Sequence, residues 1–157
     1  MTSCTLTRTT KSVTCVRYHP CDTNYAVAAC RDNSVVLVDI RTYRVIHSMR
    51  TGNLRFVGDN AKVAYSPDGE YVAAGGADGT IFLFRTAGGK LHSVLENANS
   101  SSRAVSMDVG MGIGSRAGAR AEAGRLLAGH GAAVSAMAWG RDGLVSADQM
   151  GRVVLWQ

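Results

Sequence analysis

Short apolar runs with alternating polar positions recur along the chain, and each run is bounded by turn-forming residues. Three segments, 13–40, 61–85 and 132–157, share one plan: an alternating strand, a polar turn, a strand of small residues, a tight turn and a strongly apolar strand. The closing runs are rich in β-branched and aromatic residues and have the length of strands. Equivalent positions are spaced by ~40 residues or more, which is the period of a four-stranded repeat unit. The pattern predicts an all-β protein built from repeats.

The turns between these strands have the chemistry of tight hairpins. Ser66-Pro67-Asp68-Gly69 combines a proline that fixes φ with a glycine that accepts positive φ. Asp78-Gly79 is a hairpin signal between two apolar runs, and Asp32-Asn33 fills the same place in the first segment. Together with the repeat length, they predict a β-propeller of three blades, each with four antiparallel strands. The predicted divisions are a lead-in outer strand at 1–12, repeats at 13–50, 51–96 and 125–157, and an insertion loop at 97–124.

The repeats resemble the WD-repeat family, in which His, Ser or Thr, Asp and Trp form a buried hydrogen-bond tetrad within a blade. The third repeat has Gly129-His130, Ser146 and Trp156, but Met150 stands where that pattern has Asp. In the other two repeats, the resemblance assigns Asp32, Asp39 and Asp78 to WD positions, whereas Val38 and Phe84 replace the tryptophan. We expect the matching residues to cap turns and satisfy buried polar groups rather than to act in catalysis or metal binding.

Three stretches narrow the resemblance to the autophagy-related protein 16 family. SPDGEYVAAGGADGTIFLF (66–84) is similar to the penultimate repeat of that family, and CRDNSVVLVDIRT (30–42) is similar to the repeat before it. The ending resembles the last repeat, including Ser146-Ala147-Asp148 and the missing Asp at Met150. In that family an N-terminal segment binds autophagy-related protein 5, a coiled coil dimerises, and the propeller recruits membrane-linked partners. The resemblance implies a non-catalytic, cytoplasmic scaffold that helps to recruit the ubiquitin-like conjugation complex, peripherally at the autophagosome assembly site.

Three blades raise a problem of closure, because propellers usually need four or more blades. The last repeat ends at its third strand, and Cys4–Arg8 is the candidate for a fourth, although in register it reads as the outer strand of a preceding blade. Three explanations stay open: a fragment of a longer gene, an incomplete gene model, or a chain that completes its ring by self-association. The first two are favoured.

The 97–124 stretch shifts in composition to Ser, Gly, Ala and Arg. We expect a tolerated surface insertion. The alternative is a basic loop of Arg103, Arg116, Arg120 and Arg125 that captures an acidic or phosphate-bearing partner. Residues 100–109 also imitate the start of a blade. Gly112–Ala117 matches GxGxxA, but no carboxylate stands about twenty residues on, so no dinucleotide cofactor is predicted.

Composition and charge add little to the prediction of function. The net charge is +5, but the basic residues are scattered, so no specific nucleic acid partner and only indirect membrane contact are expected. The four cysteines form no CxxC pair, so we expect reduced thiols and no metal. The start of the chain lacks the apolar core of a signal peptide.

Two further binding functions and an enzyme are alternatives to the scaffold. Val38-Asp39-Ile40-Arg41 resembles the Asp-x-Arg box of propellers that deliver substrates to cullin-based ubiquitin ligases, and Arg41 would contact the ligase adaptor. Phosphoinositide-binding propellers carry Phe-Arg-Arg-Gly, whereas Phe84-Arg85-Thr86-Ala87 has one arginine and no glycine. An enzyme ranks last, because the sequence spacing shows no nucleophile–His–acid set and no paired carboxylates.

Overall fold

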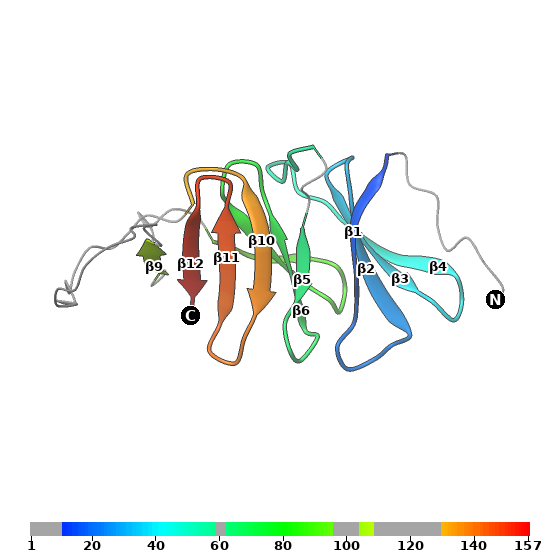
Figure 1. Cartoon of the computed structure of the whole chain (residues 1–157). Helices are drawn as coiled ribbons and strands as arrows, with labels where there is room; N and C mark the ends of the chain where they lie inside the picture. Colours follow the sequence, from blue (N-terminus) through cyan, green and yellow to red (C-terminus); the bar gives the residue numbers. More distant parts are fainter. Residues whose placement is uncertain (1–10, 59–61, 96–103, 109–129) are drawn as a thin grey trace, which may run out of the picture.

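The computed structural model describes residues 11–58, 62–95, 104–108 and 130–157. Over these residues the chain is all-β and forms three four-stranded antiparallel sheets, which lie side by side as a partial propeller (Figure 1). The strands of the first sheet are β1 (Val13–Tyr18), β2 (Tyr25–Cys30), β3 (Ser34–Asp39) and β4 (Arg44–Met49). Those of the second are β5 (Val63–Tyr65), β6 (Tyr71–Gly75), β7 (Ile81–Arg85) and β8 (Leu91–Leu95). The third sheet contains β10 (Val134–Trp139), β11 (Leu144–Asp148), β12 (Arg152–Trp156) and β9 (Ala104–Asp108).

The predicted hairpins between the second and third strands of each sheet share one backbone conformation. Asn33, Gly79 and Gly151 occupy equivalent turn positions and have φ values of 62°, 87° and 82°. A left-handed residue at this point suits Gly and Asn, because their side chains add the least steric cost. The sequence therefore places the same tight turn in every repeat, even where the flanking Asp is missing.

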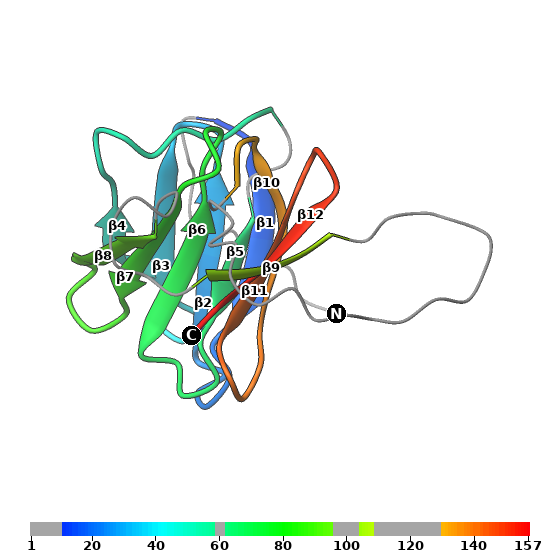
Figure 2. The same cartoon turned by 90° about the vertical axis from the view of Figure 1, so that its left-hand side faces the viewer.

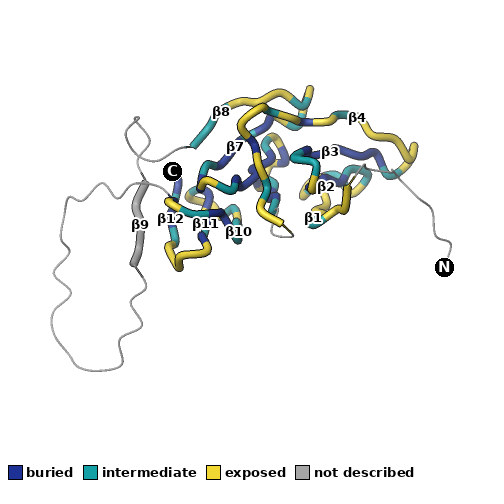
Figure 3. The backbone as a smooth tube through the Cα atoms, turned by 90° about the horizontal axis from the view of Figure 1, so that it is seen from above, coloured by how far each residue is buried: buried dark blue, intermediate teal, exposed yellow. Residues whose placement is uncertain are grey.

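Apolar side chains from neighbouring sheets form two cores. One core joins the first and second sheets and includes Val27, Leu37 and Phe82. The other joins the second and third sheets and includes Ile81 and Trp156. Figure 3 shows burial concentrated on the middle strands of the sheets, above all β2 and β3, whereas the outer strand β4 is largely exposed. The first strands of neighbouring sheets lie next to one another: β5 contacts both β1 and β10, as expected for blades arranged around an axis.

The outer strand of the third sheet is the clearest difference from the prediction. Residues 97–124 were expected to form an insertion loop, but Ala104–Asp108 forms β9 and pairs with β12, from Arg152↔Asp108 to Trp156↔Ala104 (Figure 2). The overall Gly, Ser and Arg content of the stretch favours a loop, but AVSMD by itself alternates in the manner of a strand. Ala104–Asp108 thus completes the third sheet at its outer edge, whereas the other residues of 97–124 lie outside the described part of the chain.

Several predicted features lie outside the described residues. They are the Cys4–Arg8 strand, the GxGxxA match at 112–117, and the loop residues Arg103, Arg116 and Arg120. Within the described part of the chain, no helix has the length and apolar character that a membrane crossing requires.

Candidate protein-interaction site

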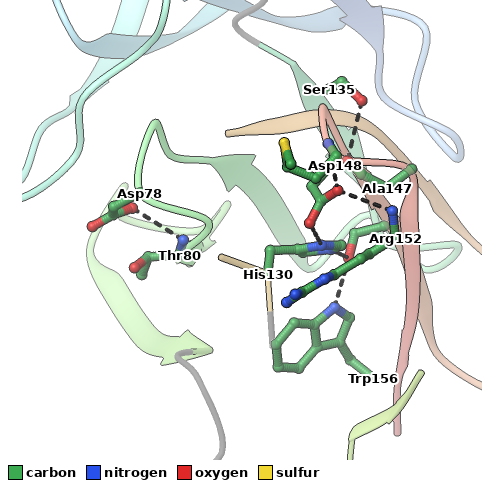
Figure 4. Close-up of polar contacts among 10 residues, drawn as sticks. Asp78, Thr80, His130, Ser135, Ala147, Asp148, Arg152 and Trp156 are labelled. Carbon is green, nitrogen blue, oxygen red and sulfur yellow. Dashed lines mark hydrogen bonds and ion pairs between the residues drawn. The ribbon is translucent and has the colours of Figure 1, made fainter. Parts of the chain in front are cut away.

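Four side chains of the third sheet form a buried chain of hydrogen bonds (Figure 4). His130 precedes β10, Ser146 and Asp148 lie on β11, and Trp156 lies on β12. His130 Nε2 is 2.6 Å from Ser146 Oγ, and His130 Nδ1 is 3.1 Å from Asp148 Oδ2. Trp156 Nε1 donates to Ser146 Oγ at 2.7 Å. Pairing between β11 and β12 holds these side chains in reach of one another.

The chemistry of the two ends fixes the direction of this chain. An indole N–H can only donate and a carboxylate can only accept, so Trp156 donates to Ser146, Ser146 to His130 Nε2, and His130 Nδ1 to Asp148. This order requires a neutral imidazole with its proton on Nδ1. Burial lowers the pKa of His130, although the hydrogen bond to Asp148 opposes the change. The neutral form is therefore the one that the structure favours.

Asp148 is the member of this network that the WD pattern alone does not place. Its Oδ1 accepts from the backbone N–H groups of Met150, at 2.9 Å, and Arg152, at 3.0 Å. Burial by itself would raise the pKa of Asp148, but the N–H of Arg152 and the bond from His130 outweigh it and lower the pKa. Met150, which stands in the expected Asp position, is 77% exposed. The sequence signal was the Ser-x-Asp of residues 146–148, which supplies the carboxylate two residues earlier.

In the first two sheets, the predicted residues Asp32 and Asp78 cap the equivalent hairpin turn. Asp32 Oδ1 accepts from Ser34 N at 3.2 Å, and Asp78 Oδ1 accepts from Thr80 N at 3.0 Å. Ser34, Thr80 and Arg152 are equivalent positions, so Asp148 replaces the missing turn aspartate of the third sheet. Asp32 also pairs with the exposed side chain of Arg50 at 2.7 Å. These contacts are those of turn caps.

The serine, histidine and aspartate of the network have the order of a hydrolase triad, which the sequence spacing did not reveal. Ser146, His130 and Asp148 are 1%, 2% and 5% exposed, respectively. The indole N–H of Trp156 donates to Ser146 Oγ. The indole therefore fills the position that a substrate carbonyl would need. The geometry supports a structural role rather than nucleophilic catalysis.

The network also joins the second and third sheets. Gly79 approaches His130 so closely that an added Cβ would lie 2.3 Å from the His130 carbonyl oxygen. Val134 N donates to Gly76 O at 3.1 Å, and Trp139 Nε1 donates to Ala64 O at 3.3 Å. The close approach of Gly79 to His130 and the hydrogen bonds of Val134 and Trp139 together fix the third sheet against the second.

Arg41, the other predicted contact residue, lies in the turn that follows β3, two residues after Asp39. Their side chains are 3.5 Å apart, and the Arg41 side chain is 61% exposed. Asp39 Oδ1 also accepts from the N–H groups of Arg41 and Thr42. Burial would raise the pKa of Asp39, but these N–H groups together lower it. Arg41 is held by Asp39 yet remains accessible to a partner.

Two open clefts flank the Ser66–Gly69 turn of the second sheet. The first, of about 540 Å³, lies between the first and second sheets and is lined by His19, His47, Glu70 and Arg85 among others. The second has a similar volume, lies between the second and third sheets, and includes His92 and Arg141. Asp68 borders both clefts. Mixed charge and apolar lining make this end of the sheets a candidate surface for a protein partner.

Metal binding has no support in the described part of the chain. No group of three or more His, Cys, Asp or Glu side chains there is arranged to hold a metal ion.

The comparisons with known proteins agree with this architecture. The model of the WD domain, G-beta repeat, matches residues 2–39 and 59–85. Among curated relatives, the chain is 30% identical over 93 residues to protein tipD of Dictyostelium discoideum, which covers 59% of the chain and 15% of the relative. It is 33% identical over 76 residues to autophagic-related protein 16.2 of Caenorhabditis elegans, covering 48% and 14%. It is 29% identical over 138 residues to protein Atg16l2 of Homo sapiens, covering 87% and 17%.

The sheets, the turns and the polar network have the architecture of a WD-repeat propeller, and the WD-domain model matches part of the chain. Within that class it is related to the autophagy-related protein 16 family, whose members include two of these relatives by name. The match with each of the three relatives spans less than a fifth of that relative's length, between 14% and 17%.

Proposed function

We propose that the chain is a non-catalytic interaction module of an autophagy-related protein 16-like subunit, and that it helps to recruit the ubiquitin-like conjugation complex during autophagosome formation. The similarity to proteins named autophagic-related protein 16.2 and Atg16l2 carries the proposal. A cytoplasmic protein that reaches the assembly site through protein partners fits this role. The third-sheet network supports it by making the Ser–His–Asp set a structural element.

The two clefts beside the Ser66–Gly69 turn are the proposed contact surface. They lie at the same end of adjacent sheets and are accessible, whereas the opposite ends of these strands carry the turns capped by Asp32 and Asp78. Glu70 is exposed and lines the first cleft. Its replacement changes the charge of the surface without removing a core contact.

The experiment is recruitment of the tagged full chain to autophagosome marker sites after autophagy is induced. We expect the unmodified chain to colocalise with the lipid-conjugated ubiquitin-like protein and Glu70→Lys to weaken that colocalisation. Asp78→Lys is the matched control, because it makes the same type of charge change at the other end of the sheet. A folded chain that stays diffuse under induction would contradict the proposal.

A second candidate is a substrate-receptor propeller of a cullin-based ubiquitin ligase, favoured by the exposed Arg41 that Asp39 holds in place. Affinity capture of the ligase adaptor by the chain, lost in Arg41→Ala, supports this function. Arg44→Ala is the matched control, because Arg44 is also exposed and lies on the neighbouring strand β4. Equal adaptor capture by Arg41→Ala and the unmodified chain, or no capture by either, contradicts the Arg41 contact.

A further inference from the structure

The second cleft, between the second and third sheets, is lined by aromatic rings from both of them. Tyr71 lies on β6, two residues before Ala73, so its side chain shares the face of the second sheet that packs against the third. From the third sheet, Trp139 at the end of β10 contributes its indole to the lining. The indole N–H donates to the carbonyl oxygen of Ala64 at 3.3 Å, so the ring is held in place and offers its apolar surface to the cleft.

A bulge in β8 adds a third ring. The pairing of β7 with β8 is irregular between Leu83 and Phe84, which leaves His92 as an extra residue of β8. The imidazole of His92 lies against Tyr71, with the ring centroids 4.9 Å apart and the ring planes tilted by 46°. Ser93 pairs directly with Leu83, so these two side chains point to the same side of the sheet, and both line the cleft. The second cleft is therefore an aromatic groove with a hydroxyl at its wall.

The polar side chains around these rings are mainly hydrogen-bond donors. Arg141, in the turn between β10 and β11, can only donate, and Tyr71, His92 and Ser93 can each donate one hydrogen. Within the described part of the chain, no hydrogen bond engages any of these four side chains. Among the described lining residues Asp68 is the only carboxylate, and its Oδ1 already accepts two hydrogen bonds from its own turn. The groove consequently offers more donors than acceptors to a ligand.

A ligand that suits this groove brings apolar rings and carbonyl oxygens but few N–H groups. A buried N–H that finds no acceptor costs free energy, so a peptide with an N–H at every residue would leave some of them unpaired here. Proline has no backbone N–H, keeps its carbonyl and carries an apolar ring. The polyproline II helix has no internal hydrogen bonds, so all of its carbonyls stay available to a partner. Aromatic-lined grooves are a general means of recognising such segments.

The size and position of the cleft disfavour other peptide conformations. Its volume of about 540 Å³ is that of a small-ligand site and admits a few extended residues. An α-helix with its side chains is about 10–12 Å across, which is too wide for such a site. Strand addition needs a free strand edge, whereas this cleft opens between the faces of two sheets.

We propose that the second cleft binds a proline-rich segment of a partner protein in the polyproline II conformation. The rings of Tyr71, His92 and Trp139 contact the prolines. The guanidinium of Arg141 and the hydroxyl of Ser93 donate to the carbonyls of the segment.

The segment comes from another protein rather than from these 157 residues. They include two prolines, Pro20 and Pro67, and both lie in connections between strands of the described sheets. The partner named in this way is the one that the proposed function recruits, so the proposal rests on that function.

The test is a titration of the 157-residue chain with a capped synthetic peptide of about eight prolines, which adopts the polyproline II conformation by itself. Tryptophan fluorescence reports contact with Trp139, and a saturable change is expected. An alanine-rich helical peptide and a flexible Gly–Ser peptide of the same length are the comparison ligands. Absence of saturable binding by the proline peptide, or equally tight binding of either comparison peptide, overturns the proposal.

Three variants locate the contact. Tyr71→Ala should weaken binding of the proline peptide at least about tenfold, because it removes a ring of the groove. Arg141→Ala should weaken it about tenfold, because a charged donor is lost. Tyr71→Phe keeps the ring and should weaken binding only about threefold. Unchanged binding in both alanine variants contradicts the proposed contact.

Matched controls come from the β3–β4 hairpin, which lines neither cleft at these positions. Tyr43→Ala and Arg44→Ala remove an exposed tyrosine and an exposed arginine there, and both should bind the peptide like the unmodified chain. Equal losses in the controls and the groove variants would overturn the proposal. Melting curves report whether each variant folds. If Tyr71→Ala unfolds, Arg141→Ala decides the question, because Arg141 is exposed in a turn.

The titration also separates this proposal from the proposed function. Loss of peptide binding together with intact colocalisation at autophagosome marker sites would overturn the groove and leave the recruitment function. Saturable peptide binding by a chain that stays diffuse in induced cells would overturn the recruitment function and leave the groove.

Discussion

The second and third sheets fill equivalent buried positions with different side chains. In the third sheet, Ser146 and Trp156 are joined by hydrogen bonds through His130 to Asp148. At the positions equivalent to Ser146 and Trp156, the second sheet has Ala74 and Phe84, both fully buried in an apolar core. The backbone of the two sheets is nevertheless alike, with the same strand pairing and the same left-handed turn. The polar network is therefore not required to form a blade.

The apolar cluster of the second sheet and the polar network of the third sheet should tolerate different substitutions. An apolar cluster loses transfer free energy and leaves a cavity when one member is reduced in size. A buried polar network instead leaves unpaired groups when one member is removed, and each such group carries a desolvation cost. The third sheet should consequently be sensitive to changes of hydrogen-bonding capacity that preserve volume, and the second sheet should not.

The largest effect is expected at Asp148. Asp148→Ala leaves His130 Nδ1 and the N–H groups of Met150 and Arg152 without their acceptor, so the free energy of unfolding should fall by about 3 kcal/mol. Chemical denaturation followed by tryptophan fluorescence measures the change. The matched variant is Asp78→Ala, which removes the exposed turn carboxylate of the second sheet and should cost no more than about 1 kcal/mol. Equal losses in the two variants would show that the network contributes nothing beyond a turn cap.

A rescue at Met150 sharpens the comparison and is expected to be smaller. The turn position of Met150 corresponds to that of Asp32 and Asp78, whose carboxylates reach the amide two residues on. Met150→Asp in the Asp148→Ala background should therefore restore the acceptor for Arg152 N and recover about 1–2 kcal/mol. The same substitution in the unmodified chain should be near neutral or unfavourable, because two carboxylates then compete for one amide. Absence of any difference between the two backgrounds would contradict the exchange of roles.

Local sequence signals predict the strands and turns, whereas the hydrogen-bond partner of His130 depends on which side chains the fold brings together. The three sheets were predictable because Val35–Val38, Ile81–Phe84 and Val153–Trp156 are β-branched and aromatic runs of strand length and because the turns are local. Asp148 was not assigned, since the pattern specifies a residue position, whereas the network needs only a carboxylate within reach of His130 and Arg152.

The β9 strand and the clefts could not be derived in the same way. Ala104–Asp108 pairs with a strand more than forty residues later, and no local signal specifies such a partner. The clefts arise between sheets, where His47 and Glu70 come together only after packing. Arg41 lies in the turn that follows β3, and its ion pair with Asp39 depends on that turn.

Acidification is expected to give the smallest of the three effects. The pKa of His130 is lowered in the folded state, mainly by burial, so the unfolded chain takes up a proton at this position more readily. Its contribution to stability is complete above the ordinary histidine pKa of about 6.5 and is lost as the pH falls through that value. Asp148 also has a lowered pKa, but its contribution is lost only below the ordinary aspartate pKa, near 3.8. Between pH 7.5 and 5, the loss therefore belongs to His130.

The measurement is the denaturation midpoint at several pH values in this window, compared with that of His130→Asn. The unmodified chain should become less stable on acidification, whereas the variant, which is less stable at every pH, should show a shallower dependence. His19, His47 and His92 remain in both proteins, so any titration they contribute is common to the two curves. A charged imidazole donates from both nitrogens, so Ser146 Oγ would accept from His130 as well as from Trp156, and the hydroxyl proton of Ser146 would lose its acceptor. Parallel curves would mean that His130 is protonated without disturbing the fold, and the neutral network would then have to be rejected.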